Sequence, residues 1–156
     1  MQPNFKRMIT LIDEVFETRN DPNQLQVNEA EMEKLQHIHA DTLTEIANEE
    51  GPTTWVLLIP TTKNLMLDFL QGKINETQLL HLTEIGATYT CIYLCSATTL
   101  PEFRGKGQTL NASIQAIHNI QQQHPIQELF VWHFTPEGKA LANKIATLTG
   151  LTLHSK

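Results

Sequence analysis

Residues 91–109 read CIYLCSATTLPEFRGKGQT, and they divide into an apolar run, a proline turn and a glycine-containing loop. The run at 91–95 is apolar throughout, which is typical of a central strand that is covered on both faces. Beyond the loop, apolar side chains recur at helical spacing over residues 110–120. The sequence therefore predicts a long strand over residues 88–100, then a tight loop, then a helix.

The loop has the composition of a phosphate-binding turn. Gly105 and Gly107 allow backbone conformations and a close approach that a side chain would block, while Arg104 and Lys106 add positive charge. A helix that starts directly after such a loop aims unpaired N–H groups and a partial positive charge at an anion. The spacing is neither that of a Walker loop nor that of the dinucleotide fingerprint. Taken alone, the loop also fits an ordinary strand-to-helix turn with two exposed cations.

Upstream, the sequence predicts two helices and a hairpin. Apolar side chains recur at helical spacing over residues 5–16, and residues 28–38 have the pattern of a second helix that starts with a capping box. Weak alternation over residues 42–48, turn-forming residues at 49–52 and strand-forming residues at 54–59 indicate a β-hairpin. The chain therefore places helices before its first strands.

The remaining segments predict three helices and one strand. Residues 61–71 and 75–82 have the pattern of short helices, and the second of them has residues that suit a capping box. Residues 128–134 form another apolar strand candidate. A threonine followed by a proline starts the last helix at residue 135, and Gly150 ends it.

Composition and charge narrow the class of function. The chain has 156 residues, of which 40% are hydrophobic, and this size suits one globular domain. Its net charge of −6 is uneven: residues 1–50 hold eleven acidic and four basic residues (−7), and residues 51–156 hold six and seven (+1). Scattered Lys and Arg in an acidic chain argue against binding to nucleic acid. The second part of the chain would tolerate an anionic ligand better than the first.

Targeting and metal signals are weak in this sequence. Residues 1–10 lack the apolar core of a signal peptide, and no run approaches the length of a membrane span. Cys91 and Cys95 have the spacing of neither a zinc ribbon nor a disulfide framework, and the seven histidines show no metal-ligand spacing. We therefore expect a cytoplasmic protein with reduced cysteines, no membrane association and no metal.

Residues 95–107 resemble motif A of the GCN5-related N-acetyltransferase (GNAT) superfamily, in which a strand ends in Pro-Glu-aromatic-Arg-Gly-x-Gly before a helix. The loop pattern of that family, Gln/Arg-x-x-Gly-x-Gly/Ala, falls on Arg104, Gly107 and Thr109. The chain departs from it at Thr109, where Gly or Ala is usual. Residues 129–151 are similar to motif B, with a leucine in place of the usual final phenylalanine.

The resemblance covers residues 88–151 and implies an α/β (α+β) fold in one domain over residues 1–156, with N-terminal helices in 4–40 and a cofactor-binding core in 88–153. It implies a mixed, twisted central sheet flanked by helices, with acetyl-CoA between two splayed parallel strands. The pyrophosphate would lie on the loop, and the pantetheine arm would run beside the strand end. The residues that the resemblance assigns to the cofactor are Ala97, Thr98, Thr99, Arg104, Gly105, Lys106, Gly107, Gln108 and Thr109.

In such enzymes an amine attacks the thioester directly, which requires a base, an oxyanion donor and an acid for the leaving thiolate. A backbone N–H near Thr98 or Thr99 would be the oxyanion donor. The usual tyrosine acid falls on Ala146, which has no proton to donate. The candidate substitutes are Tyr93, Cys95, the two threonine hydroxyls and bulk water. The candidates for the base are Glu84, Glu45 and His133.

The sequence is compatible with two functions. The first is an acetyl-CoA-dependent N-acyltransferase with a small-molecule or protein amine as acceptor. The acidic helices at residues 4–40 would suit a cationic acceptor, although acidic helix faces are commonly just solvated. The second is a non-catalytic domain that binds coenzyme A or a protein partner, which Ala146 and Thr109 favour. Acyl chain length and homodimer formation are also left open.

Overall fold

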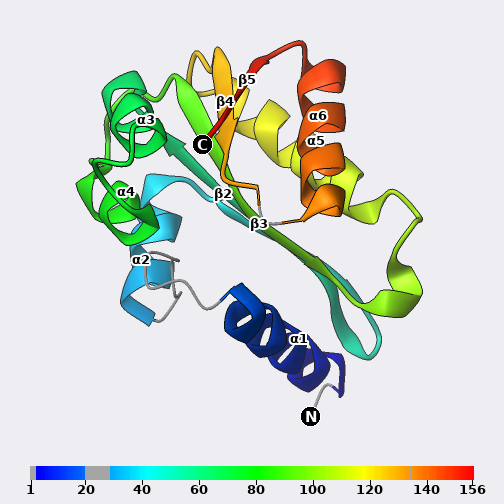
Figure 1. The fold of residues 1–156 in the computed structure, drawn as a ribbon. Coiled ribbons are helices and arrows are strands. Elements are labelled where there is room, and N and C mark those ends of the chain that lie inside the picture. Colours follow the sequence, from blue (N-terminus) through cyan, green and yellow to red (C-terminus); the bar gives the residue numbers. More distant parts are fainter. Residues whose placement is uncertain (1–2, 20–28, 134) are drawn as a thin grey trace.

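The computed structural model describes residues 3–19, 29–133 and 135–156 (Figure 1). The α-helices in these ranges are α1 (Pro3–Arg19), α2 (Glu29–Ile38), α3 (Lys63–Leu70), α4 (Glu76–Leu82), α5 (Gln108–Gln121) and α6 (Pro136–Thr149). The strands are β1 (Leu43–Asn48), β2 (Gly51–Thr61), β3 (Cys91–Thr99), β4 (Glu128–Val131) and β5 (Thr152–Ser155). A short 3₁₀-helix, η1 (Pro101–Phe103), follows β3.

The strands form one mixed sheet in the order β1-β2-β3-β4-β5. The pairs β1–β2 and β2–β3 are antiparallel, whereas β3–β4 and β4–β5 are parallel. Each parallel connection contains a helix, α5 after β3 and α6 after β4, as a parallel crossover requires. The chain therefore has an α+β architecture with an open five-stranded mixed sheet, which confirms the fold class at this level.

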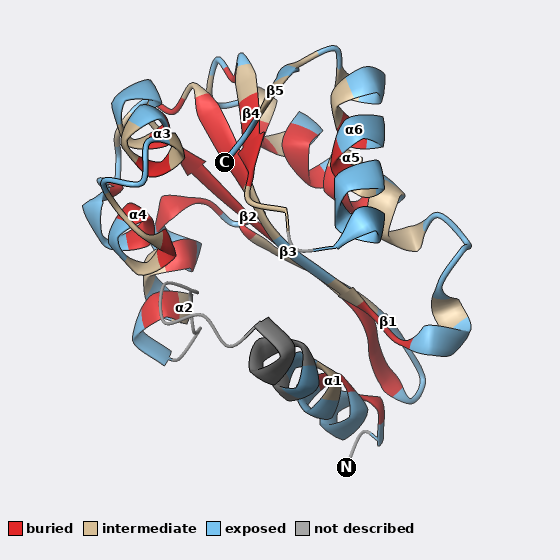
Figure 2. Ribbon diagram, viewed as in Figure 1, coloured by how far each residue is buried: buried red, intermediate tan, exposed pale blue. Residues whose placement is uncertain are grey.

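The helices form two groups about the sheet (Figure 1). The crossover helices α5 and α6 contact each other, and α5 also contacts β1, β2 and β3. The helices α2, α3 and α4 form the second group, in which α3 contacts β3. The helix α1 contacts β2 and β3. Buried residues gather on β2, β3 and β4 and on the inward faces of these helices (Figure 2).

An aromatic cluster fills the core between α3 and the centre of the sheet. The Phe69 ring lies 4.8 Å from that of Tyr93 and 5.7 Å from that of Phe130, and the Tyr93 and Phe130 rings lie 5.0 Å apart. All three side chains are fully buried. Burial of one such side chain stabilises a fold by about 1.5–3 kcal/mol, so this cluster fixes α3 to the strands.

The expected helices and the hairpin are confirmed, with ends that differ by a few residues. The capping box of α4 is present, because the Asn75 side chain accepts from the Gln78 N–H and the Gln78 side chain accepts from the Asn75 N–H. The cap expected at Asn28 lies outside the described residues. The strand expected over residues 128–134 is shorter than predicted, because β4 ends at Val131 and residues 132 and 133 do not belong to a strand. None of the described helices is both long and apolar enough to cross a bilayer.

Two details of the sheet differ from expectation. Gly51 and Pro52 belong to β2 and not to the turn, and Pro52 opposes Ala47 where the β1–β2 register shifts. Such an irregularity tolerates a proline, which has no N–H to donate. The sequence also gave no sign of β5, a short edge strand with an exposed threonine and serine at its ends.

Candidate cofactor-binding site

The parallel strands β3 and β4 pair over a short distance, and β4 ends at Val131, one residue beyond the last pair. Their register runs from Cys91–Glu128 to Tyr93–Phe130. Beyond Tyr93, β3 continues to Thr99 and stays paired with β2 on its other side. In the described sheet, residues 94–99 therefore have no strand partner on the side of β4. We call this part of the sheet the β3–β4 divergence.

A bulge in β3 accompanies the divergence. The β2–β3 register shifts next to the Leu57–Ser96 pair, so Cys95 has no residue opposite it on β2. A bulge bends a strand and increases its local twist. Ser96 and Ala97 are exposed although β3 is the central strand of the sheet. Ala97 lies in the segment where the cofactor arm was predicted, whereas Thr99 in the same segment is buried.

The loop after β3 starts α5 with a glycine. Gly107 is the N-cap residue with φ 77° and ψ 8°, and Gly105 also has φ 77°. This left-handed region favours glycine over residues that carry a Cβ. No side chain caps α5, and no described hydrogen bond outside the helix uses the backbone N–H groups of residues 105–109. The first N–H groups of α5 are therefore without a described partner outside the helix, an arrangement that suits an anion.

Hydroxyl and amide groups anchor this loop to the sheet. The Thr99 hydroxyl lies 2.6 Å from that of Thr109 and 3.1 Å from that of Thr54. The Gln108 side-chain carbonyl accepts from Thr54 at 3.2 Å and from Thr53 at 3.4 Å. Thr109, which departs from the family loop pattern, thus joins the start of α5 to the end of β3. Thr99 and Gln108 position the loop through their side chains.

The two loop cations are exposed. Arg104 Nε donates to the Thr99 carbonyl at 3.0 Å, which folds this side chain back along the strand end. Lys106 Nζ lies 5.5 Å from the centroid of the Phe103 ring. Both charges therefore lie on the segment between β3 and α5, beside the exposed N–H groups of the helix start.

The Thr99 network makes a prediction about stability. Replacing Thr99 with Val keeps the shape but removes the hydroxyl that Thr54 and Thr109 share, which should lower the free energy of unfolding by about 1–3 kcal/mol. The control is Thr98→Val, at a partly exposed neighbour in the same strand, with an expected change within about 0.5 kcal/mol. Urea denaturation measures both values, and equal losses in the two variants would contradict the anchoring role of Thr99.

A buried carboxylate that the sequence did not single out lies at the divergence. Glu76, in the first turn of α4, is buried and accepts a hydrogen bond of 2.6 Å from the Tyr93 hydroxyl. The Cys95 thiol lies 3.7 Å from the same Glu76 oxygen. Glu76 looked like an ordinary helix-start acid because it directly follows the capping residue Asn75. Its burial against β3 depends on how α4 packs, which the local sequence does not reveal.

The remaining candidates for proton transfer are dispersed. Glu84 is exposed after α4, and Glu45 is exposed on β1, where it accepts from Trp55 Nε1 at 2.7 Å. His133 Nε2 lies 2.9 Å from the Ser155 hydroxyl, and its buried Nδ1 has no hydrogen-bond partner among the described residues. The structure therefore brings Tyr93 and Cys95 together with Glu76, but it does not bring Glu84, Glu45 or His133 into that group.

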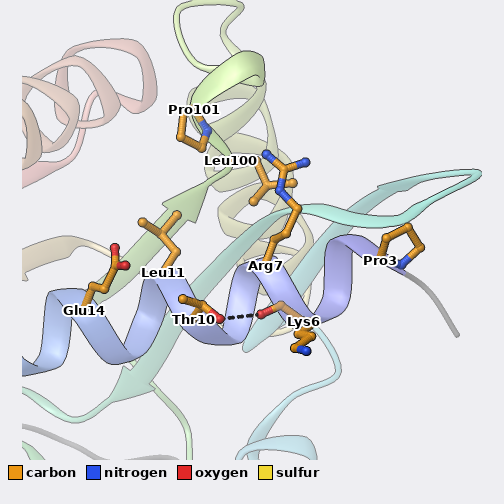
Figure 3. A pocket seen from close by; sticks show the side chains of 8 residues that line it. All are labelled: Pro3, Lys6, Arg7, Thr10, Leu11, Glu14, Leu100 and Pro101. Atoms are coloured by element: carbon orange, nitrogen blue, oxygen red, sulfur yellow. Dashed lines mark hydrogen bonds between the residues drawn. The ribbon is translucent and has the colours of Figure 1, made fainter.

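A shallow pocket of about 580 Å³ lies between α1 and the end of β3 (Figure 3). Its charged lining residues are Lys6, Arg7 and Glu14. Arg7 also forms an ion pair of 2.6 Å with Glu102 of η1, which joins α1 to the segment before the loop. This pair raises the pKa of Arg7 and lowers that of Glu102. The pocket thus combines two cations with one acid, although the N-terminal part of the chain is acidic.

No family model matches this chain, and neither does any curated protein or solved structure. In the described ranges, no three or more His, Cys, Asp or Glu side chains are grouped so that they could hold a metal ion. A phenol, a thiol and a buried carboxylate lie at or next to the divergence, and backbone N–H donors and two cations lie on the loop that leads from β3 to α5.

Proposed function

We propose that this chain binds acetyl-CoA and transfers the acetyl group to an amine by direct attack, as GNAT-like acyltransferases do. The observation that carries the proposal is the β3–β4 divergence, followed at once by the uncapped N-terminus of α5. The pyrophosphate would lie on the N–H groups of residues 105–109, with the side chains of Arg104 and Lys106 beside it. The pantetheine arm would run along the backbone of residues 97–99.

The proposed reaction requires the chain to move protons. Acetyl-CoA supplies an activated acyl thioester; attack by the amine forms the N–C bond of a tetrahedral intermediate, and the C–S bond breaks when this intermediate collapses. Glu76, which accepts a hydrogen bond from the Tyr93 hydroxyl, would accept the proton that the acceptor ammonium loses. A backbone N–H near Thr98 or Thr99 would stabilise the oxyanion, and a proton must reach the leaving thiolate. Cys95 lies in the same group and is a candidate for that step.

A non-catalytic coenzyme A-binding domain is the second candidate. Ala146, at the position of the usual tyrosine acid, is a partly buried residue of α6 without a hydroxyl. Tyr93 could replace this tyrosine as a phenol, but its hydroxyl donates to Glu76. A domain that kept the loop and lost the acid would bind coenzyme A without turning it over.

The two candidates differ in thiol release. With acetyl-CoA and a panel of small amines and lysine peptides, an acyltransferase should release free coenzyme A in proportion to acylated amine. Saturable binding of acetyl-CoA without amine-dependent thiol release would favour the non-catalytic domain. Absence of binding up to millimolar acetyl-CoA would contradict both candidates.

A further inference from the structure

The ammonium of Lys156 lies over two aromatic rings. Its Nζ is 4.8 Å from the centroid of the Phe69 ring and 4.7 Å from that of the Trp132 ring. The Lys156 N–H donates to the Val131 carbonyl at 2.9 Å, which extends the β4–β5 pairing and fixes the backbone. Within the described residues this ammonium forms no ion pair with a carboxylate. It is therefore held as aromatic sites hold alkylammonium ligands.

This aromatic pair borders the β3–β4 divergence. Phe69 contacts Tyr93 and Phe130, which form the last pair of the β3–β4 register, and Trp132 follows directly after β4. The rings of Phe69 and Trp132 lie 6.4 Å apart. Tyr93 in turn donates to the buried Glu76. In Figure 1 the C mark lies in front of the sheet beside β4.

We infer that Phe69 and Trp132 form a binding site for an alkylammonium group, and that Lys156 occupies this site until an external ligand displaces it. The ligand would be a primary alkylammonium ion of the lysine side-chain type. That this ligand is the acceptor amine rests on the proposed acyl transfer. That the site binds an alkylammonium ion does not depend on that proposal. Cation–π contacts are individually weak, so the affinity for an external amine is low while Lys156 competes from within the chain.

Trp132 fluorescence reports on this site directly. In a Trp55→Phe background Trp132 is the single tryptophan of the chain. Titration with n-butylammonium should give a saturable change in emission, and Lys156→Ala should tighten this binding by about fivefold or more. The matched control is Lys139→Ala, which removes an exposed lysine on α6 and should leave the affinity unchanged. Neutral 1-butanol should give no saturable change, because it lacks the charge that the rings recognise.

The site is overturned if Lys156→Ala binds n-butylammonium no more tightly than Lys139→Ala, or if 1-butanol binds equally well. Phe69→Leu keeps an apolar residue in the core but removes one of the two rings. When it is added to Lys156→Ala, the tighter binding of n-butylammonium should be lost. Acetyl-CoA is absent from these titrations, so they succeed or fail independently of the proposed transfer. If the protein binds n-butylammonium but not acetyl-CoA, the ammonium site is supported and its proposed role as the acceptor site is contradicted.

Discussion

Gly107→Asp should weaken acetyl-CoA binding by about tenfold or more relative to Gly107→Asn. Both side chains tolerate the left-handed conformation of Gly107 and both serve well as N-cap residues, so they differ mainly in charge. The aspartate carboxylate would face the pyrophosphate at the N-terminus of α5. A unit charge at about 4 Å repels another by about 1 kcal/mol in water and about 4 kcal/mol near a protein surface. Isothermal titration calorimetry measures the two affinities.

The Asn variant also tests whether the loop has room for a side chain. A Cβ at Gly107 would meet only the Asn111 side-chain nitrogen, at 3.7 Å, which is ordinary contact. Thermal unfolding of the two variants should therefore give similar midpoints. Equal affinity of Gly107→Asp and Gly107→Asn for acetyl-CoA would show that no phosphate group lies on the start of α5.

Glu76→Gln should slow acyl transfer by about 100- to 10,000-fold while the affinity for acetyl-CoA changes by less than about twofold. The range is that of a general acid or base removed from a positioned site. The glutamine oxygen can still accept the hydrogen bond from Tyr93, so the fold keeps its buried contact. Glutamine cannot take up the proton that the acceptor loses. Initial rates of thiol release at saturating acetyl-CoA measure the effect.

Glu128 provides a matched control at the opposite end of β3. Its Oε2 lies 3.7 Å from the Cys91 thiol, the same separation as between Glu76 and the Cys95 thiol. Glu128 also contacts Lys63 and His154, away from the divergence. Glu128→Gln should therefore leave the rate of transfer within about twofold. If both variants slow transfer equally, or neither does, Glu76 is not the proton acceptor.

Much of the fold could be predicted because local signals act within a few residues. The capping box at Asn75 and the Thr135 cap of α6 each determine a helix start through contacts three residues apart. The apolar run of β3 marked the centre of the sheet. The sequence did not predict β5, because this edge strand has only four residues. They are exposed at both ends and partly buried between them, so they show little periodicity.

The candidate site was predictable only where it depends on local sequence. The positive φ angles at Gly105 and Gly107 follow from residue type and position, and the structure has them. Glu76 and Lys156 were not predicted, because each reaches the divergence from a distant part of the chain. Glu76 comes with α4, and Lys156 comes with β5, the strand that the pattern did not reveal. Contacts of this kind depend on how elements pack and not on spacing.

Amide chemical shifts of the native chain on addition of acetyl-CoA test the proposed cofactor site most directly. The account predicts saturable shifts that are largest at the amides of residues 105–109 and 97–99, where helix-start N–H groups and unpaired strand backbone are available. Dephospho-coenzyme A, which lacks the 3′-phosphate, should shift the same amides with a lower affinity, because it carries less negative charge. Absence of shifts at millimolar acetyl-CoA, or shifts confined to other surfaces, would contradict the account.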